Sequence, residues 1–330
     1  MTRYARQIAV PAFGQQGQDR LARARVLVVG AGGLAAPVLQ YLGGAGVGQI
    51  RLVDADHISR SNLHRQTLFR EAEVGQPKAQ TAATAIRALN PDITVTPITR
   101  TLDPANVASL CAGVDLVLDC ADSFATSYIL SDHCKAMGLP LISASVVGME
   151  GHVGGFCGTA PSLRALFPDL PQRAGSCASD GVLGPVVGMI GALQAQMAVA
   201  VLAGITPSPL GQFVTFDALS LRSSSFRFDA AAEPAPEEIW RFVAATQIDA
   251  RDHIIDLRAP SEGPLVHPHA QRRSLQEIAQ APPAPQSPDQ RAILACRSGL
   301  RAFAAARHLA PLWGGNITLV ALGDTTGGET

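Results

Sequence analysis

The chain has 330 residues, 47% of them apolar, and its 26 basic and 27 acidic side chains leave a formal charge of −1. This length suits two domains with sizeable cores, and the balanced charge and few aromatic residues argue against a surface that binds nucleic acid or another polyanion. The six cysteines include no CxxC pair and no signal-peptide pattern opens the chain, so we expect free thiols in a cytoplasmic protein.

Strand and helix patterns alternate through the first part of the chain. Apolar runs of strand length occur at 26–29, 50–53, 114–122, 140–146 and 212–219, and helical patterns occur at 34–43, 78–89 and 126–137. A strand, a helix and a second strand within about 30 residues form a parallel unit. This order predicts an α/β fold with a Rossmann-like, mostly parallel sheet and flanking helices.

A long apolar segment at 181–205 has the length of a membrane span. It contains Pro185, Gln194 and Gln196, and no basic cluster flanks it. We therefore interpret it as a helix buried in the core or at a subunit interface, and we expect no membrane association.

The composition changes after the strand predicted at 212–219. Residues 229–238 are rich in Ala, Pro and Glu, which is typical of a linker. Strands are predicted beyond it at 253–257, 292–295 and 316–322, and a helix at 300–309. We therefore predict two domains, 1–228 and 239–330, joined by the linker 229–238, and the second is a small α/β domain.

A glycine-rich turn with Gly30, Gly32 and Gly33 follows the first predicted strand. Small residues there let the backbone approach a phosphate at a helix N-terminus, where free N–H groups and the helix dipole favour an anion. Asp54 ends the second strand, where an acid can bond a ribose hydroxyl. The pattern indicates an adenine nucleotide, and by itself it fits NAD as well as ATP.

The polar side chains that follow favour ATP. Asn62, Arg65, Gln66 and Lys78 come soon after the second strand, and Asp122 ends a further one. A triphosphate carries about four negative charges and its departing pyrophosphate needs compensation, whereas a dinucleotide needs little cationic charge. A carboxylate at that strand end can hold Mg²⁺ against phosphate oxygens. Surface charges and a helix N-cap remain the alternative interpretations of single residues in this set.

At these residues the chain resembles the ThiF/MoeB/HesA family, the bacterial relatives of ubiquitin-activating enzymes. Six segments up to about residue 220 carry the resemblance: RYARQ (3–7), GAGGLAAPVLQYLGGAGVGQIRLVDAD (30–56), SNLHRQ (61–66), VGQPK (74–78), DCAD (119–122) and GVLGPVVGMIGALQA (181–195). The resemblance implies that MgATP is used to adenylate the C-terminal glycine of a ubiquitin-like sulfur carrier. That carrier would be similar to ThiS, of thiamine thiazole synthesis, or to MoaD, of molybdopterin synthesis.

The resemblance also implies roles for single residues. Asp54 would bind the ribose and Asp122 would bind Mg²⁺. The phosphates would be contacted by three side chains, Asn62, Arg65 and Lys78. Arg6, in RYARQ, would reach the phosphates of the partner subunit's site, which implies a homodimer.

The chain departs from the family pattern at two places. The first CxxC pair of a structural zinc site would fall in PSLRALFP, where Ser162 and Ala165 stand, and no pair follows residue 220. A four-thiolate site cannot be built from the remaining cysteines, so we predict no structural zinc. Ser123 and Ser127 replace the family's Asn and Arg beside Asp122, which leaves the detail of the metal site and the activity open.

Two cysteines are candidates for handling sulfur. Cys177 lies in RAGSCASDG (173–181), where a family cysteine can form a covalent link with the carrier. Cys296 opens CRSGLR between a strand and a helix, where N–H groups and arginines would lower its pKa and stabilise a thiolate or persulfide. With IIDLRAP (254–260), this loop resembles the active site of rhodanese-like sulfurtransferases. Structural thiols are the alternative for both, and a phosphatase-like loop would need a longer spacing than CRSGLR has.

These inferences combine into an adenylyltransferase–sulfurtransferase. The first domain would convert the carrier's carboxylate into an acyl-adenylate. Cys296, loaded as a persulfide by a donor such as a cysteine desulfurase, would attack it, and Cys177 would resolve the product to leave a thiocarboxylate. A non-catalytic carrier-binding scaffold and an NAD-dependent oxidoreductase are the alternatives, and the sequence does not decide which carrier is used or whether the second domain is active.

Overall fold

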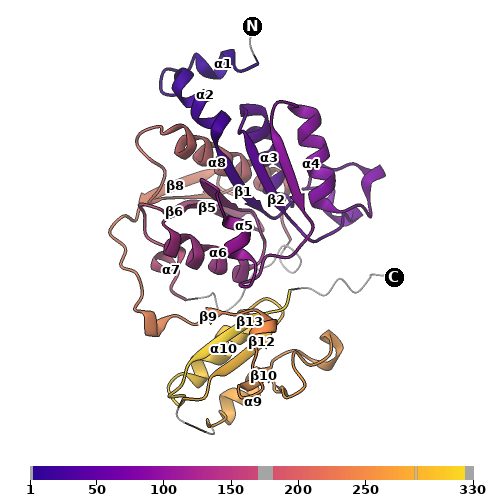
Figure 1. Cartoon of the computed structure of the whole chain (residues 1–330), viewed down its shortest axis with the longest axis vertical. Helices are drawn as coiled ribbons and strands as arrows, with labels where there is room; N and C mark the ends of the chain where they lie inside the picture. Colours follow the sequence, from indigo (N-terminus) through magenta and orange to yellow (C-terminus); the bar gives the residue numbers. More distant parts are fainter. Residues whose placement is uncertain (1–2, 170–180, 286, 288, 324–330) are drawn as a thin grey trace.

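The structure is a computed structural model that describes residues 3–169, 181–285, 287 and 289–323. Two separate sheets organise these residues, one with eight strands and one with five. We call the elements from α1 to β8 the N-terminal unit and those from β9 to β13 the C-terminal unit. Figure 1 shows the two units one above the other, with helix α6 and strand β9 near their boundary.

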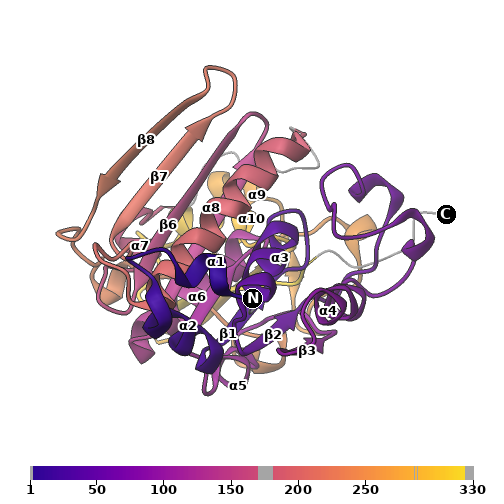
Figure 2. The same ribbon diagram turned by 90° about the horizontal axis from the view of Figure 1, so that it is seen from above.

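The sheet of the N-terminal unit has the strand order β3-β2-β1-β4-β5-β6-β7-β8. Its strands are β1 (Arg25–Val29), β2 (Gln49–Val53), β3 (Thr94–Ile98), β4 (Leu116–Asp119), β5 (Pro140–Val147), β6 (Glu150–Cys157), β7 (Gln212–Asp217) and β8 (Arg222–Arg227). Strands β1 to β5 are parallel, and β6, β7 and β8 extend the sheet in antiparallel fashion. The predicted α/β fold with a mostly parallel, Rossmann-like sheet is confirmed. Figure 2 shows β7 and β8 as a long hairpin at one edge.

Helices cover both faces of this sheet. They are α1 (Ala5–Ile8), α2 (Gly14–Arg23), α3 (Ala35–Ala45), α4 (Lys78–Leu89), α5 (Val107–Cys111), α6 (Phe124–Met137), α7 (Leu163–Leu166) and α8 (Gly184–Ala203), with short 3₁₀ turns at Arg60–Asn62 and Glu71–Glu73. Side chains alternate along β1, so Val26 and Val28 pack with α3, α4 and α8, while Leu27 and Val29 pack with α5 and α6. Two apolar layers therefore hold the sheet.

Helix α8 is the long apolar segment of the sequence. Its length and composition would suit a membrane span, but 56% of its apolar window is buried inside the protein, where it packs against α2, α3, β5 and β6. Gln194 has a structural role there, because its Nε2 donates to the carbonyl oxygens of Asp119 (2.7 Å) and Ile142 (3.0 Å). The prediction of a helix that packs in the core is confirmed, and its alternative, a subunit interface, stays a prediction.

The C-terminal unit is built on a parallel sheet with the order β11-β10-β12-β13-β9. Its elements are β9 (Arg241–Phe242), β10 (His253–Asp256), β11 (Gln271–Arg272), α9 (Leu275–Gln280), β12 (Ala292–Cys296), α10 (Leu300–Leu309) and β13 (Ile317–Ala321), with 3₁₀ turns at Pro236–Glu238, Ala245–Gln247 and Pro260–Glu262. The predicted strands and helix of this region correspond to β10, β12, β13 and α10. The predicted linker, 229–238, lies between β8 and β9.

Candidate functional site

The glycine turn lies at the carboxyl end of β1, between the ends of β2 and β4. Gly30 has a φ of +94°, and a Cβ there would lie 2.6 Å from the carbonyl oxygen of Cys120 and 3.0 Å from the amide nitrogen of Ala121. A Cβ on Gly33 would lie 2.7 Å from Val187. By contrast, a Cβ on Gly32 would meet only Gln66 Nε2, at 3.7 Å, which is an ordinary van der Waals contact. Gly32 is therefore the least crowded of the three glycines, and a ligand can approach the backbone there.

Two polar side chains border this turn. The Asp54 carboxylate accepts the N–H groups of Ala31 (2.6 Å) and Asp56 (2.7 Å), and burial raises its pKa above the usual value. Gln66 is 4% exposed, and its Oε1 has no hydrogen-bond partner among the described residues. A buried acceptor without a partner beside the glycine turn indicates a ligand that brings a donor, such as a hydroxyl or an amino group.

Lys78 is the first residue of α4, and it lies at the same edge of the sheet as the glycine turn. Its Nζ lies 2.9 Å from Oδ2 of Asp56, and its side chain is 8% exposed whereas that of Asp56 is 58% exposed. The backbone fixes this position, because Pro77 approaches the helix in an extended conformation and the Lys78 N–H donates to the carbonyl of Asp56. The ammonium group is therefore buried beside Asp54, whose pKa it helps to lower.

Asn62 ends the first 3₁₀ turn, and Arg65 belongs to the loop that follows it. The Arg65 side chain passes 3.5 Å from the position of a Cβ on Gly33, and its Nη1 contacts Ser61 O (3.3 Å) and His64 Nε2 (2.8 Å). The carbonyl of Asn62 accepts the N–H groups of Arg65 and Gln66. The structure thus brings Arg65 and Gln66 to the glycine turn.

Asp122 lies three residues past the end of β4, beside the same turn. Its side chain is exposed. Ala121, the residue before it, is the one whose nitrogen approaches Gly30. The carboxylate therefore faces solvent at the edge of the glycine turn, which is where the sequence predicts a metal ligand.

Asp119, the last residue of β4, is a polar residue that the sequence reasoning missed. It is fully buried, and its carboxylate accepts the Ser143 hydroxyl (2.7 Å) and the Ala121 N–H (3.2 Å). Burial raises its pKa from 3.8 to about 6. The available signal was a carboxylate that closes an otherwise apolar strand, VLVLD.

Arg6 is the predicted site residue that the chain does not bring to the glycine turn. It is exposed on α1, and α1 sits against the C-terminal ends of α3 and α4, where Tyr4 packs on Gly46 and bonds Asn90. Those helix ends lie at the opposite edge of the sheet, far from the C-terminal unit (Figure 1). Its predicted contact with the partner subunit's site stays a prediction. Cys177 lies outside the described residues.

Cys296 ends β12, and we call residues 296–301 the sulfur loop. Its Sγ accepts the N–H groups of Gly299 (3.1 Å) and Ala302 (3.4 Å), so the expected cradle of N–H donors is present. The expected low pKa is wrong, because Cys296 is fully buried and burial raises its pKa more than the N–H donors and Arg301 lower it.

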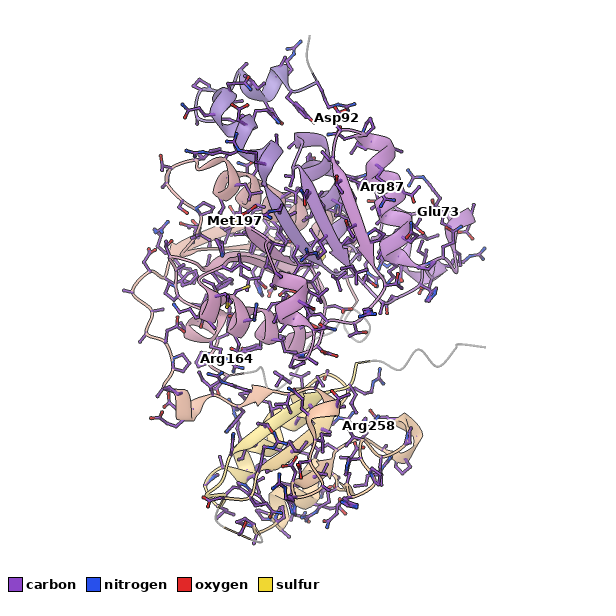
Figure 3. The ribbon with its side chains drawn as sticks, in the orientation of Figure 1. Glu73, Arg87, Asp92, Arg164, Met197 and Arg258 are labelled. Carbon is purple, nitrogen blue, oxygen red and sulfur yellow. The ribbon has the colours of Figure 1, made fainter. Side chains whose placement is uncertain are left out.

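Two arginines, one at the end of the sulfur loop and one on the segment after β10, already form ion pairs. Arg301 donates to both carboxylate oxygens of Glu262 and to the carbonyl of Leu257 (2.9 Å). Arg258 forms a buried pair with Asp256 at 2.8 Å, and Figure 3 shows it inside the C-terminal unit. The guanidinium groups of both arginines are thus held by carboxylates and are not hydrogen-bonded to the Cys296 sulfur.

At the position predicted for the first pair of zinc-binding cysteines, this chain makes a different set of contacts. Ser162 caps α7, and its N–H and hydroxyl donate to Glu233 of the predicted linker at 2.8 and 2.5 Å. Glu233 also pairs with Lys135 of α6 at 2.9 Å. Within the described ranges, three or more His, Cys, Asp or Glu side chains gather nowhere in a metal-binding group. The predicted absence of zinc stays a prediction.

Comparison with known proteins gives one matching family model and many similar chains. The model of the ThiF family matches residues 4–237. The SAMP-activating enzyme E1 of Haloferax volcanii is 40% identical over 223 residues, 67% of this chain and 83% of that protein. The molybdopterin-synthase adenylyltransferase of Escherichia coli is 43% identical over 222 residues, 67% of this chain and 89% of that protein.

Two further comparisons are partial. The adenylyltransferase and sulfurtransferase MOCS3 of Bos taurus is 46% identical over 224 residues, which are 66% of this chain and 48% of that protein. The crystal structure of Escherichia coli MccB with ATP covers 71% of this chain and 72% of its own, at a TM-score of 0.61 and 21% identity, which is a likeness of fold. The match to MOCS3 thus spans about half the length of that relative.

Proposed function

Because this chain belongs to the ThiF family, we propose that it is an ATP-dependent adenylyltransferase that activates the C-terminal carboxylate of a ubiquitin-like sulfur carrier. The observation that carries the proposal is the glycine turn bordered by a buried acceptor without a partner, Gln66, and by the buried side chain of Lys78. Relatives named as adenylyltransferases and as an E1 enzyme support it.

The residues present fit a nucleotide triphosphate. The phosphates would lie over Gly32 at the N-terminus of α3, where N–H groups are free of helix partners. Lys78 would turn from Asp56 to a phosphate, and Arg65 and Asn62 would add contacts from their loop. Asp54 and Gln66 would hold the ribose. Asp122 would hold Mg²⁺, which would neutralise phosphate charge when bound.

The proposed first step joins two anions. A carboxylate oxygen of the carrier attacks the α-phosphorus, the bond to the β-phosphate breaks, and pyrophosphate leaves with its electron pair. Lys78 and Arg65 would reduce the repulsion and stabilise the charge that develops on the leaving group. The product is an acyl-adenylate, whose carbonyl carbon is far more electrophilic than that of the carboxylate.

We further propose that the C-terminal unit is a rhodanese-like sulfurtransferase, with domain boundaries at 1–228, 229–238 and 239–330. A donor such as a cysteine desulfurase would load Cys296 as a persulfide. The terminal sulfur attacks the acyl carbon, AMP leaves, and an acyl disulfide forms. Cys177 then attacks Cys296 Sγ, which releases the thiocarboxylate and leaves a Cys177–Cys296 disulfide for an external dithiol to reduce. The two N–H donors around Cys296 Sγ support a role in holding anionic sulfur.

One reconstituted reaction tests both parts. The protein, ATP and a ThiS-like or MoaD-like carrier should exchange labelled pyrophosphate into ATP, and a persulfide donor should then yield carrier thiocarboxylate. Lys78→Ala or Asp122→Ala should lower exchange by at least 100-fold, whereas Arg23→Ala, an exposed cation on α2, should not. Cys296→Ser should abolish thiocarboxylate and the persulfide seen by mass spectrometry.

Other results would favour the alternatives. Carrier binding without exchange would support a non-catalytic scaffold, which Ser123 and Ser127 motivate. Reduction of NAD during turnover would support an oxidoreductase. The homodimer, the bound Mg²⁺, the persulfide donor, the identity of the carrier and the cytoplasmic location stay predictions.

A further inference from the structure

The sulfur loop packs directly on the first turn of α6. A Cβ on Gly299 would lie 3.4 Å from the Cβ of Ala125 and 2.7 Å from the ring of Phe242. Ala125 and Phe242 are buried and Cys296 has no exposed surface. We call this closed contact the docking contact. It joins the sulfur loop and the Phe242 ring of the C-terminal unit to the start of α6 in the N-terminal unit.

A second group of residues anchors the same arrangement. Arg164 is 4% exposed, donates to both carboxylate oxygens of Asp132 on α6 (2.6 and 2.9 Å), and reaches the carbonyl of Trp240 at 3.4 Å. The ring of Trp240 in turn meets Phe303 of α10 edge-on, with centroids 4.9 Å apart. Figure 3 shows Arg164 at the boundary of the two units.

Apolar packing and an ion pair also stabilise the docking contact. One continuous cluster of buried apolar side chains includes Ala125 and Tyr128 of the N-terminal unit together with Phe242 and Phe303. At its rim, Arg307 of α10 pairs with Asp169 at 2.5 Å. Burial of this kind is typical of a specific interface rather than of a loosely tethered module.

The docking contact lies beside the proposed nucleotide site. Ala125 comes three residues after Asp122, and three residues span at most about 11 Å. Cys296 Sγ is one hydrogen bond from Gly299, whose Cα side packs on Ala125. The sulfur loop therefore packs on the helix turn that follows Asp122 in the same chain.

We propose that Cys296 serves the nucleotide site of its own chain, so that sulfur passes in cis even when two chains associate. This inference rests on the proposed function. The docking contact opens, the persulfide on Cys296 turns from Ala125 toward the end of β4, and its terminal sulfur attacks the acyl carbon while AMP leaves with the electron pair of the C–O bond. The donor loads the same open state, because the closed one covers the thiol completely.

Two matched heterodimers, purified through different tags on their two chains, test the proposal. In the first, one chain is intact and the other carries both Asp122→Ala and Cys296→Ser. In the second, one chain carries Asp122→Ala and the other carries Cys296→Ser. Each heterodimer has the same two substitutions, and only their distribution differs. Transfer in cis predicts about half of the wild-type thiocarboxylate yield in the first and less than one twentieth in the second.

The opposite results overturn the proposal. Transfer between partner chains would reverse the two yields, and free diffusion of sulfur between chains would make them equal. If the wild type makes no thiocarboxylate, the proposed function fails as well, so the two failures are distinguishable. If the chains do not associate, equimolar mixtures of the separate chains provide the same contrast. Asp122→Asn and Cys296→Ala repeat the design and exclude misfolding as the cause.

Discussion

Among single residues, Asp119 determines how β4 ends. Its carboxylate accepts the Ser143 hydroxyl from β5 and the Ala121 N–H from the turn that leads to Asp122. That second bond orients the backbone beside Gly30, and so it positions the exposed Asp122 carboxylate. Because Ser143 lies 24 residues away in sequence, this network depends on the pairing of β4 with β5.

The raised pKa of Asp119 makes folding stability depend on pH. The folded protein binds the Asp119 proton more tightly than the unfolded chain does. The free energy of unfolding therefore falls as the pH rises from about 4 to about 6, and above pH 6 it stays at this lower level. A shift from 3.8 to about 6 corresponds to about 3 kcal/mol. Asp119→Asn should therefore gain stability relative to wild type by about this amount between pH 4 and pH 7 in urea unfolding. An unchanged profile in Asp119→Asn would contradict the assignment.

The sequence predicted those site residues that lie in local motifs. The glycine turn, Asp54 and Lys78 each stand at a strand or helix end that can be recognised from spacing, and the structure brings them together. The sequence could not predict the raised pKa of Cys296, because its sign depends on the burial of the thiol, in a loop whose Gly299 packs on Phe242 and Ala125. Those two residues are far from Cys296 in sequence and carry no chemical signature.

Among the elements, the apolar strands and the longer helices were predictable, whereas strands without an apolar pattern were not. The strand predicted at 114–122 appears as β4 (Leu116–Asp119), because the residues after Asp119 form the turn that its carboxylate holds. Strand β6 was missed because its glycines lower strand propensity, and β8 (RSSSFR) because it is polar and exposed along its length. Both are set by pairing with β5 and β7, which a local pattern does not reveal.

The close packing of α8 on α3 leads to a prediction for two glycines of one helix. A Cβ on Gly191 would lie 2.5 Å from the carbonyl oxygen of Leu34, a backbone atom that cannot move aside cheaply. Gly191→Ala should therefore lower the free energy of unfolding by about 1–3 kcal/mol. Gly188→Ala has no atom within 4 Å of the new Cβ and should raise it by up to about 1 kcal/mol. Urea denaturation measures both, and equal effects would contradict the packing described.

In the whole molecule, the two sheets are joined by more than the chain between β8 and β9. The docking contact, the Arg164 anchor and the attachment of Glu233 to Ser162 hold the units in one arrangement. None of these contacts could be predicted from the sequence, which indicated only a change of composition at 229–238. The predicted domain boundaries are compatible with the element order and stay a prediction.

Opening of the docking contact should control how fast reagents reach Cys296. Phe242→Leu removes the ring that covers Gly299 while keeping an apolar side chain. We expect iodoacetamide to alkylate Cys296 at least fivefold faster in this variant, as followed by mass spectrometry of the intact chain and its peptides. Phe226→Leu, which changes a half-exposed side chain of β8, is the control. An unchanged rate in Phe242→Leu would mean that this ring does not limit access.

The closed docking contact also has a protective consequence. Hydrogen peroxide converts accessible thiolates to sulfinic and sulfonic acids that a dithiol cannot restore. A sulfur atom with no exposed surface meets such oxidants only in the intervals when the two units part. Under the proposed function, the closed docking contact would shelter the Cys296 sulfur from irreversible damage, and sulfur chemistry would be confined to moments of contact with a donor or an acceptor.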